Sequence, residues 1–152
     1  MQIPQTVTIS RNDRVLWRSG SLHAKYYENF ADIFDADDLR IAQTQHKGGS
    51  HFTEWAVAIA LYRRHGYLSL VEKYEFKAHA RKQEVLARLG VVIERDKHCQ
   101  YPDLLVYDRA GNWCFVEVKT MRDNLSENQH RFFLDLEKKH GKKVQLLRLK
   151  EI

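Results

Sequence analysis

Two charged side chains stand in a stretch that otherwise predicts the middle of a buried β-strand. The stretch is CFVEVKT, residues 114–120, and its charged residues are Glu117 and Lys119. Because side chains alternate across a strand, both point to the same face, and the valines beside Glu117 point to the other. A charge moved from water into a core costs several kcal/mol unless it is paired. The two charges either pair only with each other or belong to a site.

A second carboxylate, Asp103, favours a site over a simple ion pair. It follows Pro102 and precedes the apolar residues 104–106, and a turn at residues 109–112 predicts a hairpin with the Glu117 strand. Two carboxylates on adjacent strands are not neutralised by one lysine, so they repel unless a cation lies between them. Mg²⁺ prefers oxygen ligands and keeps several waters, so one Asp and one Glu are a sufficient contribution from the protein.

Two further polar residues each allow two interpretations. Glu54 lies near the start of HFTEWAVAIALY, a predicted helix with apolar residues one turn further on. It either complements the helix dipole or turns toward the same site as the other acids. Gln129 stands three residues after Ser126, which fits a capping box. Its amide could equally face a metal-bound water or a phosphate.

The apolar patterns predict an α/β domain on a mixed sheet. Helices are expected at residues 22–34, 51–65, 78–89 and 126–140. Strands are expected at residues 67–76, 91–95, 102–108, 113–120 and 142–150, with two more short strands in residues 6–18 around a turn at 11–13. The acidic residues at 35, 37 and 38 are expected to form a solvated turn.

The composition is that of one globular domain: 152 residues, 43% apolar and 30% charged. No apolar run approaches the roughly 20 residues of a membrane helix, and the N-terminus lacks a signal-peptide pattern. We therefore expect a soluble, cytoplasmic protein without a membrane partner. Cys99 and Cys114 form no CxxC pair, which argues against zinc and disulfides. The net charge of +5 fits a phosphate-rich partner, although the lysines between residues 138 and 143 could simply complement a helix end.

Pro102-Asp103, followed after thirteen residues by Glu117-Val118-Lys119, is the signature of the PD-(D/E)XK nuclease superfamily. The flanks PDLLVY, CFVEVKTMRDNLSENQHRFFLDL and KKVQLLRL resemble the virus-type replication-repair nuclease (VRR-NUC) family. The resemblance covers about residues 50–150 and is strongest from residue 101 on. Tyr101 and Thr120 stand where that family usually has glycine.

The resemblance implies a restriction-endonuclease-like core in residues 49–152, with the order α-β-β-β-α-β and a mixed sheet flanked by helices. Its first strand would be either 68–74 or 91–95. Residues 1–48 would form an N-terminal extension packed on the core, with a possible β-hairpin and a helix.

The resemblance also implies roles for the polar residues. Asp103 and Glu117 would hold Mg²⁺ or Mn²⁺, the Val118 carbonyl would be a further ligand, and Glu54 would complete the site directly or through water. Lys119 would position or deprotonate the attacking water and stabilise charge on the phosphate. Finally, the Gln129 amide would orient water or phosphate.

The implied activity is that of a Mg²⁺-dependent endodeoxyribonuclease acting on DNA, with structured or branched DNA in repair as the more specific substrate and RNA not excluded. The alternative is a catalytically silent nuclease-fold module that binds nucleic acid for a partner protein. A third interpretation is an interaction protein whose charges form a structural cluster. A homodimer would suit cutting of both strands.

Overall fold

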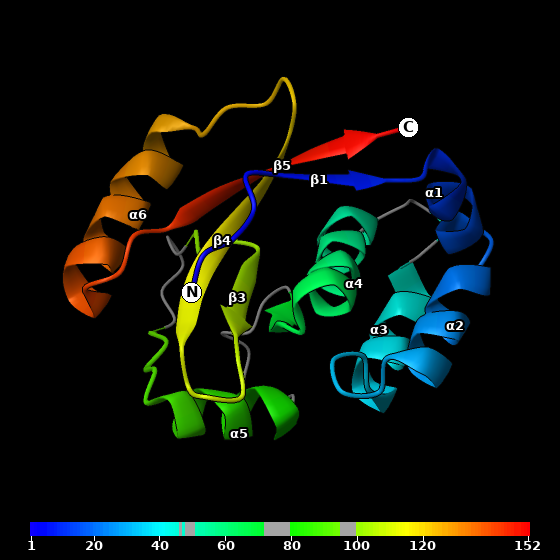
Figure 1. The fold of residues 1–152 in the computed structure, drawn as a ribbon, viewed down its shortest axis with the longest axis horizontal. Helices are drawn as coiled ribbons and strands as arrows, with labels where there is room; N and C mark the ends of the chain where they lie inside the picture. Colours follow the sequence, from blue (N-terminus) through cyan, green and yellow to red (C-terminus); the bar gives the residue numbers. More distant parts are fainter. Residues whose placement is uncertain (46, 48–50, 72–79, 95–99) are drawn as a thin grey trace.

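The structure is a computed structural model that describes residues 1–152 except 46, 48–50, 72–79 and 95–99 (Figure 1). Within the described residues, no helix combines the length and the apolar character needed to cross a membrane.

Five strands form one mixed sheet in the order β1-β5-β4-β3-β2. Their bounds are β1 Thr6–Ile9, β2 Leu68–Val71, β3 Leu104–Tyr107, β4 Trp113–Thr120 and β5 Gln145–Glu151. Strands β1, β5 and β4 are parallel to one another, whereas β3 is antiparallel to both β4 and β2. Strand β4 is therefore hydrogen-bonded on both sides.

Two helices lie on opposite sides of this sheet (Figure 1). Helix α4 (Phe52–His65) contacts β1, β2 and β4. Helix α6 (Glu127–His140) covers the other face, where the rings of Phe115 and His140 lie 5.5 Å apart. The order α4-β2-β3-β4-α6-β5 confirms the predicted α-β-β-β-α-β core, with α5 (Ala80–Leu89) inserted between β2 and β3.

The core lies on both faces of the central strands because most of their residues are apolar and buried. All four residues of β2 and of β3 are buried. The largest fully buried side chains of the sheet are those of Phe115, Leu70, Leu104, Leu105, Leu147 and Val7. A charged residue on β4 is thus placed beside an apolar interior.

The N-terminal region differs from the prediction at residues 11–18, which form helix α1 (Arg11–Arg18) and not a second strand of a hairpin. The Ser10 hydroxyl caps this helix by accepting a hydrogen bond from the Asn12 N–H at 3.1 Å. Strand β1 pairs with β5 instead. The extension therefore packs on the core through the sheet, and a domain boundary at residue 48 stays a prediction.

Helix α2 (Ser21–Asn29) is shorter than the predicted helix 22–34. The chain leaves the helix at Phe30, and Ile33 and Phe34 are completely buried in the following turn. Their apolar spacing reflects burial in the core and not continuation of the helix.

The acidic residues that follow do not form a solvated turn. Asp37 and Asp38 lie in the first turn of α3 (Ala36–Gln45). Asp38 is buried, and its carboxylate lies 3.2 Å from Arg81 of α5. The contact between Asp38 and Arg81 therefore links α3 to α5.

The first core strand is β2, so residues 68–71 confirm one of the two predicted alternatives, and residues 72–76 lie outside the described part. The other alternative, 91–95, is wrong for the described residues 91–94, which form no strand. Val92 is largely exposed, so its β-branched character does not reflect burial in the sheet.

Candidate active site

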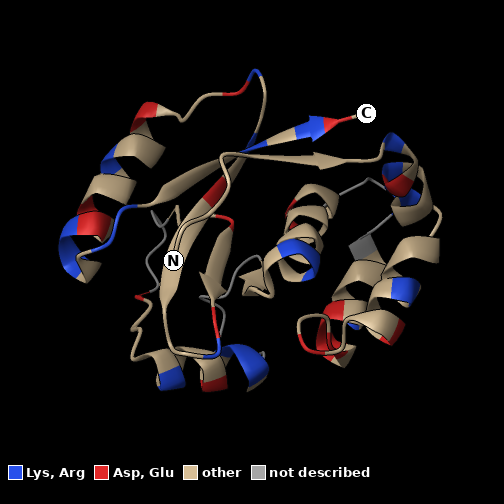
Figure 2. Ribbon diagram, in the orientation of Figure 1, with Lys and Arg blue, Asp and Glu red and all other residues tan. Residues whose placement is uncertain are grey.

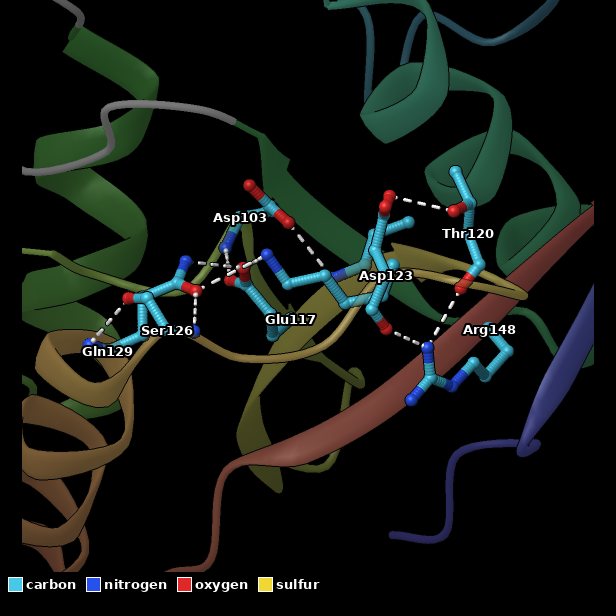
Figure 3. A network of polar contacts seen from close by, with 9 residues as sticks. Asp103, Glu117, Thr120, Asp123, Ser126, Gln129 and Arg148 are labelled. Carbon is cyan, nitrogen blue, oxygen red and sulfur yellow. Dashed lines mark hydrogen bonds and ion pairs between the residues drawn. The ribbon is translucent and has the colours of Figure 1, made fainter.

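The β3–β4 hairpin brings Asp103 and Glu117 together. Leu104 lies opposite Val116 in the antiparallel register, so the residues just before and just after them are neighbours. The Asp103 backbone N–H donates to Glu117 Oε2 at 3.2 Å, and the Val118 N–H donates to Asp103 Oδ2 at 2.9 Å (Figure 3). Each acid is thus oriented by the backbone of the opposing strand.

Lys119 lies on the same face of β4 as Glu117, as the alternation predicted. Its Nζ is 3.2 Å from Glu117 Oε1. Glu117 is only 3% exposed, and the Lys119 side chain is partly buried beside it. The two charges therefore do pair, but Asp103 adds a second carboxylate to the same cluster.

Gln129 serves as a helix cap and also contacts the charged cluster. Its Oε1 accepts from the Ser126 N–H at 3.0 Å, and the Ser126 hydroxyl accepts from the Gln129 N–H, which confirms the capping box. The same Oε1 accepts from Lys119 Nζ at 3.3 Å, while Nε2 donates to Glu117 Oε1 at 3.0 Å. The start of α6 therefore fixes the acid and the lysine relative to each other (Figure 3).

The pKa of Glu117 is raised to about 7 in the folded protein. Burial of the carboxyl group is the main cause, and the negative charge of Asp103 is the second. The hydrogen bond and charge of Lys119 act in the opposite direction without cancelling them. A second cation, or a proton, would relieve this excess of negative charge.

The donor set fits a hydrated divalent ion. Asp103 and Glu117 offer carboxylate oxygens, which Mg²⁺ and Mn²⁺ prefer, and Mg²⁺ commonly uses one or two protein carboxylates with water. Across the described part of the chain, no three His, Cys, Asp or Glu side chains are grouped to hold an ion together. Glu54 lies half-buried in the first turn of α4. Metal binding by Glu54 and by the Val118 carbonyl stays a prediction.

The sequence did not single out Arg148, which fastens the loop between β4 and α6. Its Nη1 donates to the Thr120 carbonyl at 2.8 Å and also to the Asp123 carbonyl, and Nη2 donates to Asn124 Oδ1 at 3.5 Å. The Thr120 hydroxyl donates to Asp123 Oδ2 at 2.7 Å. The sequence signal that could have identified Arg148 is its position as a charged residue between the apolar residues Leu147 and Leu149.

Residues 94–150 match the model of the VRR-NUC domain, a family of PD-(D/E)XK-type nucleases. The matched segment contains Asp103, Glu117, Lys119 and Gln129, whereas Glu54 lies outside it. The match confirms the resemblance drawn from the motifs and indicates a nuclease that acts on DNA. No match was found among curated proteins.

Proposed function

We propose that this chain, with its VRR-NUC domain, is a Mg²⁺- or Mn²⁺-dependent endonuclease that hydrolyses phosphodiester bonds in DNA. The observation that supports this most directly is the pairing of Asp103 and Glu117 across β3 and β4, with Lys119 on the same Glu117 carboxylate. A structural ion pair alone does not require the second acid, whose charge adds to the effect of burial in raising the pKa of Glu117.

Asp103 and Glu117 would hold the divalent ion, and the Val118 carbonyl and Glu54 would be further ligands, directly or through water. When bound, such an ion polarises a phosphoryl oxygen and makes its water more acidic. The backbone bonds of Val118 to Asp103 and of Asp103 to Glu117 keep both acids aimed at one place. Phosphoryl transfer depends mainly on such positioning and on neutralisation of charge.

Lys119 would orient the attacking water, or take a proton from it, and would stabilise charge on the phosphate. Its ammonium is held between Glu117 Oε1 and Gln129 Oε1. Gln129 would orient water or phosphate, and its two contacts also keep Lys119 and Glu117 from moving apart. The start of α6 thus supports the reacting groups.

The substrate would be DNA, and structured or branched DNA in repair is the specific form that we propose. The net charge of +5 fits a polyanion. We also propose a cytoplasmic location, and a homodimer or a partner protein where both strands are cut.

The test is a cleavage assay on plasmid, linear, single-stranded and four-way-junction DNA and on RNA, with Mg²⁺, Mn²⁺ or EDTA. Asp103→Asn and Lys119→Met are compared with Asp135→Asn and Lys138→Met, which change the same residue types at exposed positions of α6. We expect cutting that needs the metal and falls at least about a hundredfold in the two site variants only.

Cutting by Asp103→Asn at the rate of the parent chain would contradict the proposed site. Retarded migration of DNA without cutting under any condition would instead support the silent binding module. RNA cleavage in place of DNA cleavage would keep the site and change the substrate.

A further inference from the structure

The sheet face that carries Glu117 and Lys119 continues past the active site across β5 and β1. In the parallel register Lys119 lies beside Arg148, and Arg148 lies beside Thr6. Two residues further along, Lys150 lies beside Thr8. Because paired residues share a face, these five side chains form one strip, which we call the basic strip.

The opposite face of the same strands is buried. Val7, Ile9, Leu147 and Leu149 alternate with the strip residues and are at most 8% exposed. This alternation fixes which side of β1 and β5 faces α4 and which side carries the strip. A slip by one residue would bury the charged side chains, so the placement of the strip is determined by the core.

The basic strip is open where parallel strands are usually covered. Thr6 and Lys150 are exposed, and Thr8 and Arg148 are partly exposed. Figure 1 shows β5 and β1 extending beyond α6, which covers the other part of this face. Parallel strands generally have both faces covered. An exposed face made of hydroxyl and cationic groups therefore favours a polar, anionic partner.

The charged residues of the strip itself are all basic: Lys119, Arg148 and Lys150. Figure 2 shows basic residues along the second half of β5, with an acidic residue at its tip. That acidic residue, Glu151, alternates to the other side of the strand and pairs with Arg14 at 2.6 Å. The Glu151 carboxylate therefore does not neutralise Lys150.

We propose that the basic strip binds the phosphodiester backbone of the DNA strand on one side of the scissile phosphate. The proposal rests on the proposed function, because Lys119 belongs to both the strip and the active site. It gives β1, which lies outside the VRR-NUC match, a role in holding substrate.

The dimensions of the strip suit this partner. Neighbouring strands are about 4.8 Å apart and residues rise about 3.3 Å each, so the strip extends about 12 Å from Lys119 to Thr8. At about 3.4 Å of helical rise per nucleotide, that length corresponds to roughly three nucleotides. Lys150 would pair with a phosphate, and the hydroxyls of Thr6 and Thr8 would donate hydrogen bonds to phosphate oxygens.

Arg148 has a different part in the strip. Its guanidinium already donates to the carbonyls of the β4–α6 loop, so its removal would disturb that loop as well as any phosphate contact. The strip is therefore tested with Lys150, Thr6 and Thr8.

The experiment measures binding of the full chain to a short fluorescein-labelled DNA duplex in EDTA, by fluorescence anisotropy over a range of salt concentrations. Lys150→Gln should weaken binding about fivefold at ~0.15 M salt and lower the slope of log K against log salt by about 0.9, the effect of one lost phosphate contact. The control is Lys138→Gln, which removes the same charge at an exposed position in the last turn of α6, outside the strip, and should change neither quantity.

A second variant separates hydrogen bonding from charge. Thr6→Val combined with Thr8→Val keeps β-branched side chains on the strand and removes two hydroxyls. It should weaken binding about three- to tenfold without a change in the salt slope. Circular dichroism and urea unfolding establish that the variants are folded.

The strip proposal would be overturned if Lys150→Gln and Lys138→Gln weakened DNA binding equally, or if Lys150→Gln did not weaken it. Absence of DNA cleavage is a separate outcome, because binding is measured in EDTA, without metal. If the parent chain cuts nothing but the strip variants still weaken binding, the strip stands and the nuclease proposal fails. If cutting depends on Asp103 and all strip variants bind DNA like the parent, the nuclease proposal stands and the strip proposal fails.

Discussion

Glu117 should make the stability of the metal-free protein fall as the pH rises. The pKa of Glu117 is raised from 4.5 to about 7, first by burial and second by the charge of Asp103. Between these two pH values the folded protein keeps a proton that the unfolded chain has released. The free energy of unfolding should therefore decrease across this window, and the full stabilisation is present only below about pH 4.5.

The magnitude follows from the difference between the two pKa values. Each pH unit of difference corresponds to 1.36 kcal/mol, so the contribution of Glu117 should change by about 3 kcal/mol across the window. The side chain is 3% exposed, so solvent screening reduces this value little.

The assay compares urea unfolding of the parent chain and of Glu117→Gln in EDTA between about pH 4.5 and 8. Glutamine keeps the size of the side chain and does not ionise. Subtraction of the two curves of unfolding free energy against pH cancels the contributions of the eight histidines and of the other titrating groups. We expect Glu117→Gln to gain about 3 kcal/mol relative to the parent as the pH rises.

A pH-independent difference between the two proteins would refute the reasoning, because it would mean that Glu117 ionises in the folded protein as it does in water. Mg²⁺ provides the complementary measurement. It should stabilise the parent more at pH 8 than at pH 5, and Glu117→Gln should lose most of this gain. Asp135→Asn, at an exposed position of α6, should respond to Mg²⁺ as the parent does.

Three further predictions concern the residues around the site and one buried ion pair. Ser126→Ala should lower the free energy of unfolding by about 1 kcal/mol through loss of the helix cap. Gln129→Ala should also lower the cleavage rate, because it removes the hydrogen bonds to Glu117 and Lys119. Equal cleavage rates for the two variants would limit Gln129 to capping. Arg148→Lys should speed amide hydrogen exchange in the 121–125 loop and leave the circular dichroism unchanged, because lysine lacks the planar guanidinium that donates to several acceptors at once. Unchanged exchange would show that Arg148 does not stabilise the loop. Arg81→Met should lower the free energy of unfolding by about 3–5 kcal/mol, since it removes the guanidinium that pairs with the buried Asp38 carboxylate at 3.2 Å. A loss below about 1 kcal/mol would contradict this expectation.

The parts of the fold that the sequence predicted well carry their signals locally. The β3–β4 hairpin has a tight turn between two apolar runs, and the capping box of α6 needs only Ser126 and Gln129. Helix α4 ends at Gly66 with a φ of 69°, a conformation that glycine adopts readily. Each of these features depends on residues within a few positions of one another, so the sequence pattern was sufficient.

The prediction for residues 11–18 failed although a local signal was present. Ser10 followed by Asp13 in the first turn is typical of a helix start, whereas the alternation of apolar Val15 and Trp17 also fits a strand. Trp17 is completely buried and Val15 is 62% exposed. Both patterns fit a short segment, and packing against the rest of the protein decides between them.

The contacts that the sequence did not predict join residues far apart in the chain. Arg81 meets Asp38 across 43 positions, and Arg148 meets Asn124 across 24. Such pairs depend on which elements become neighbours in three dimensions. The site residues of the hairpin were predictable for the opposite reason, because β3 and β4 are adjacent in both sequence and space.

The position of Glu117 on β4 explains why a proton and a metal ion should compete for this site. Strand β4 is hydrogen-bonded to β3 on one side and β5 on the other, so the backbone of Glu117 cannot move away from Asp103 without breaking the sheet. On a loop, repulsion between two carboxylates would be relieved by movement, but here it is relieved only by added positive charge. A proton supplies that charge below about pH 7, the raised pKa of Glu117. Metal affinity should therefore decline as the pH falls through that value, with each bound ion displacing about one proton.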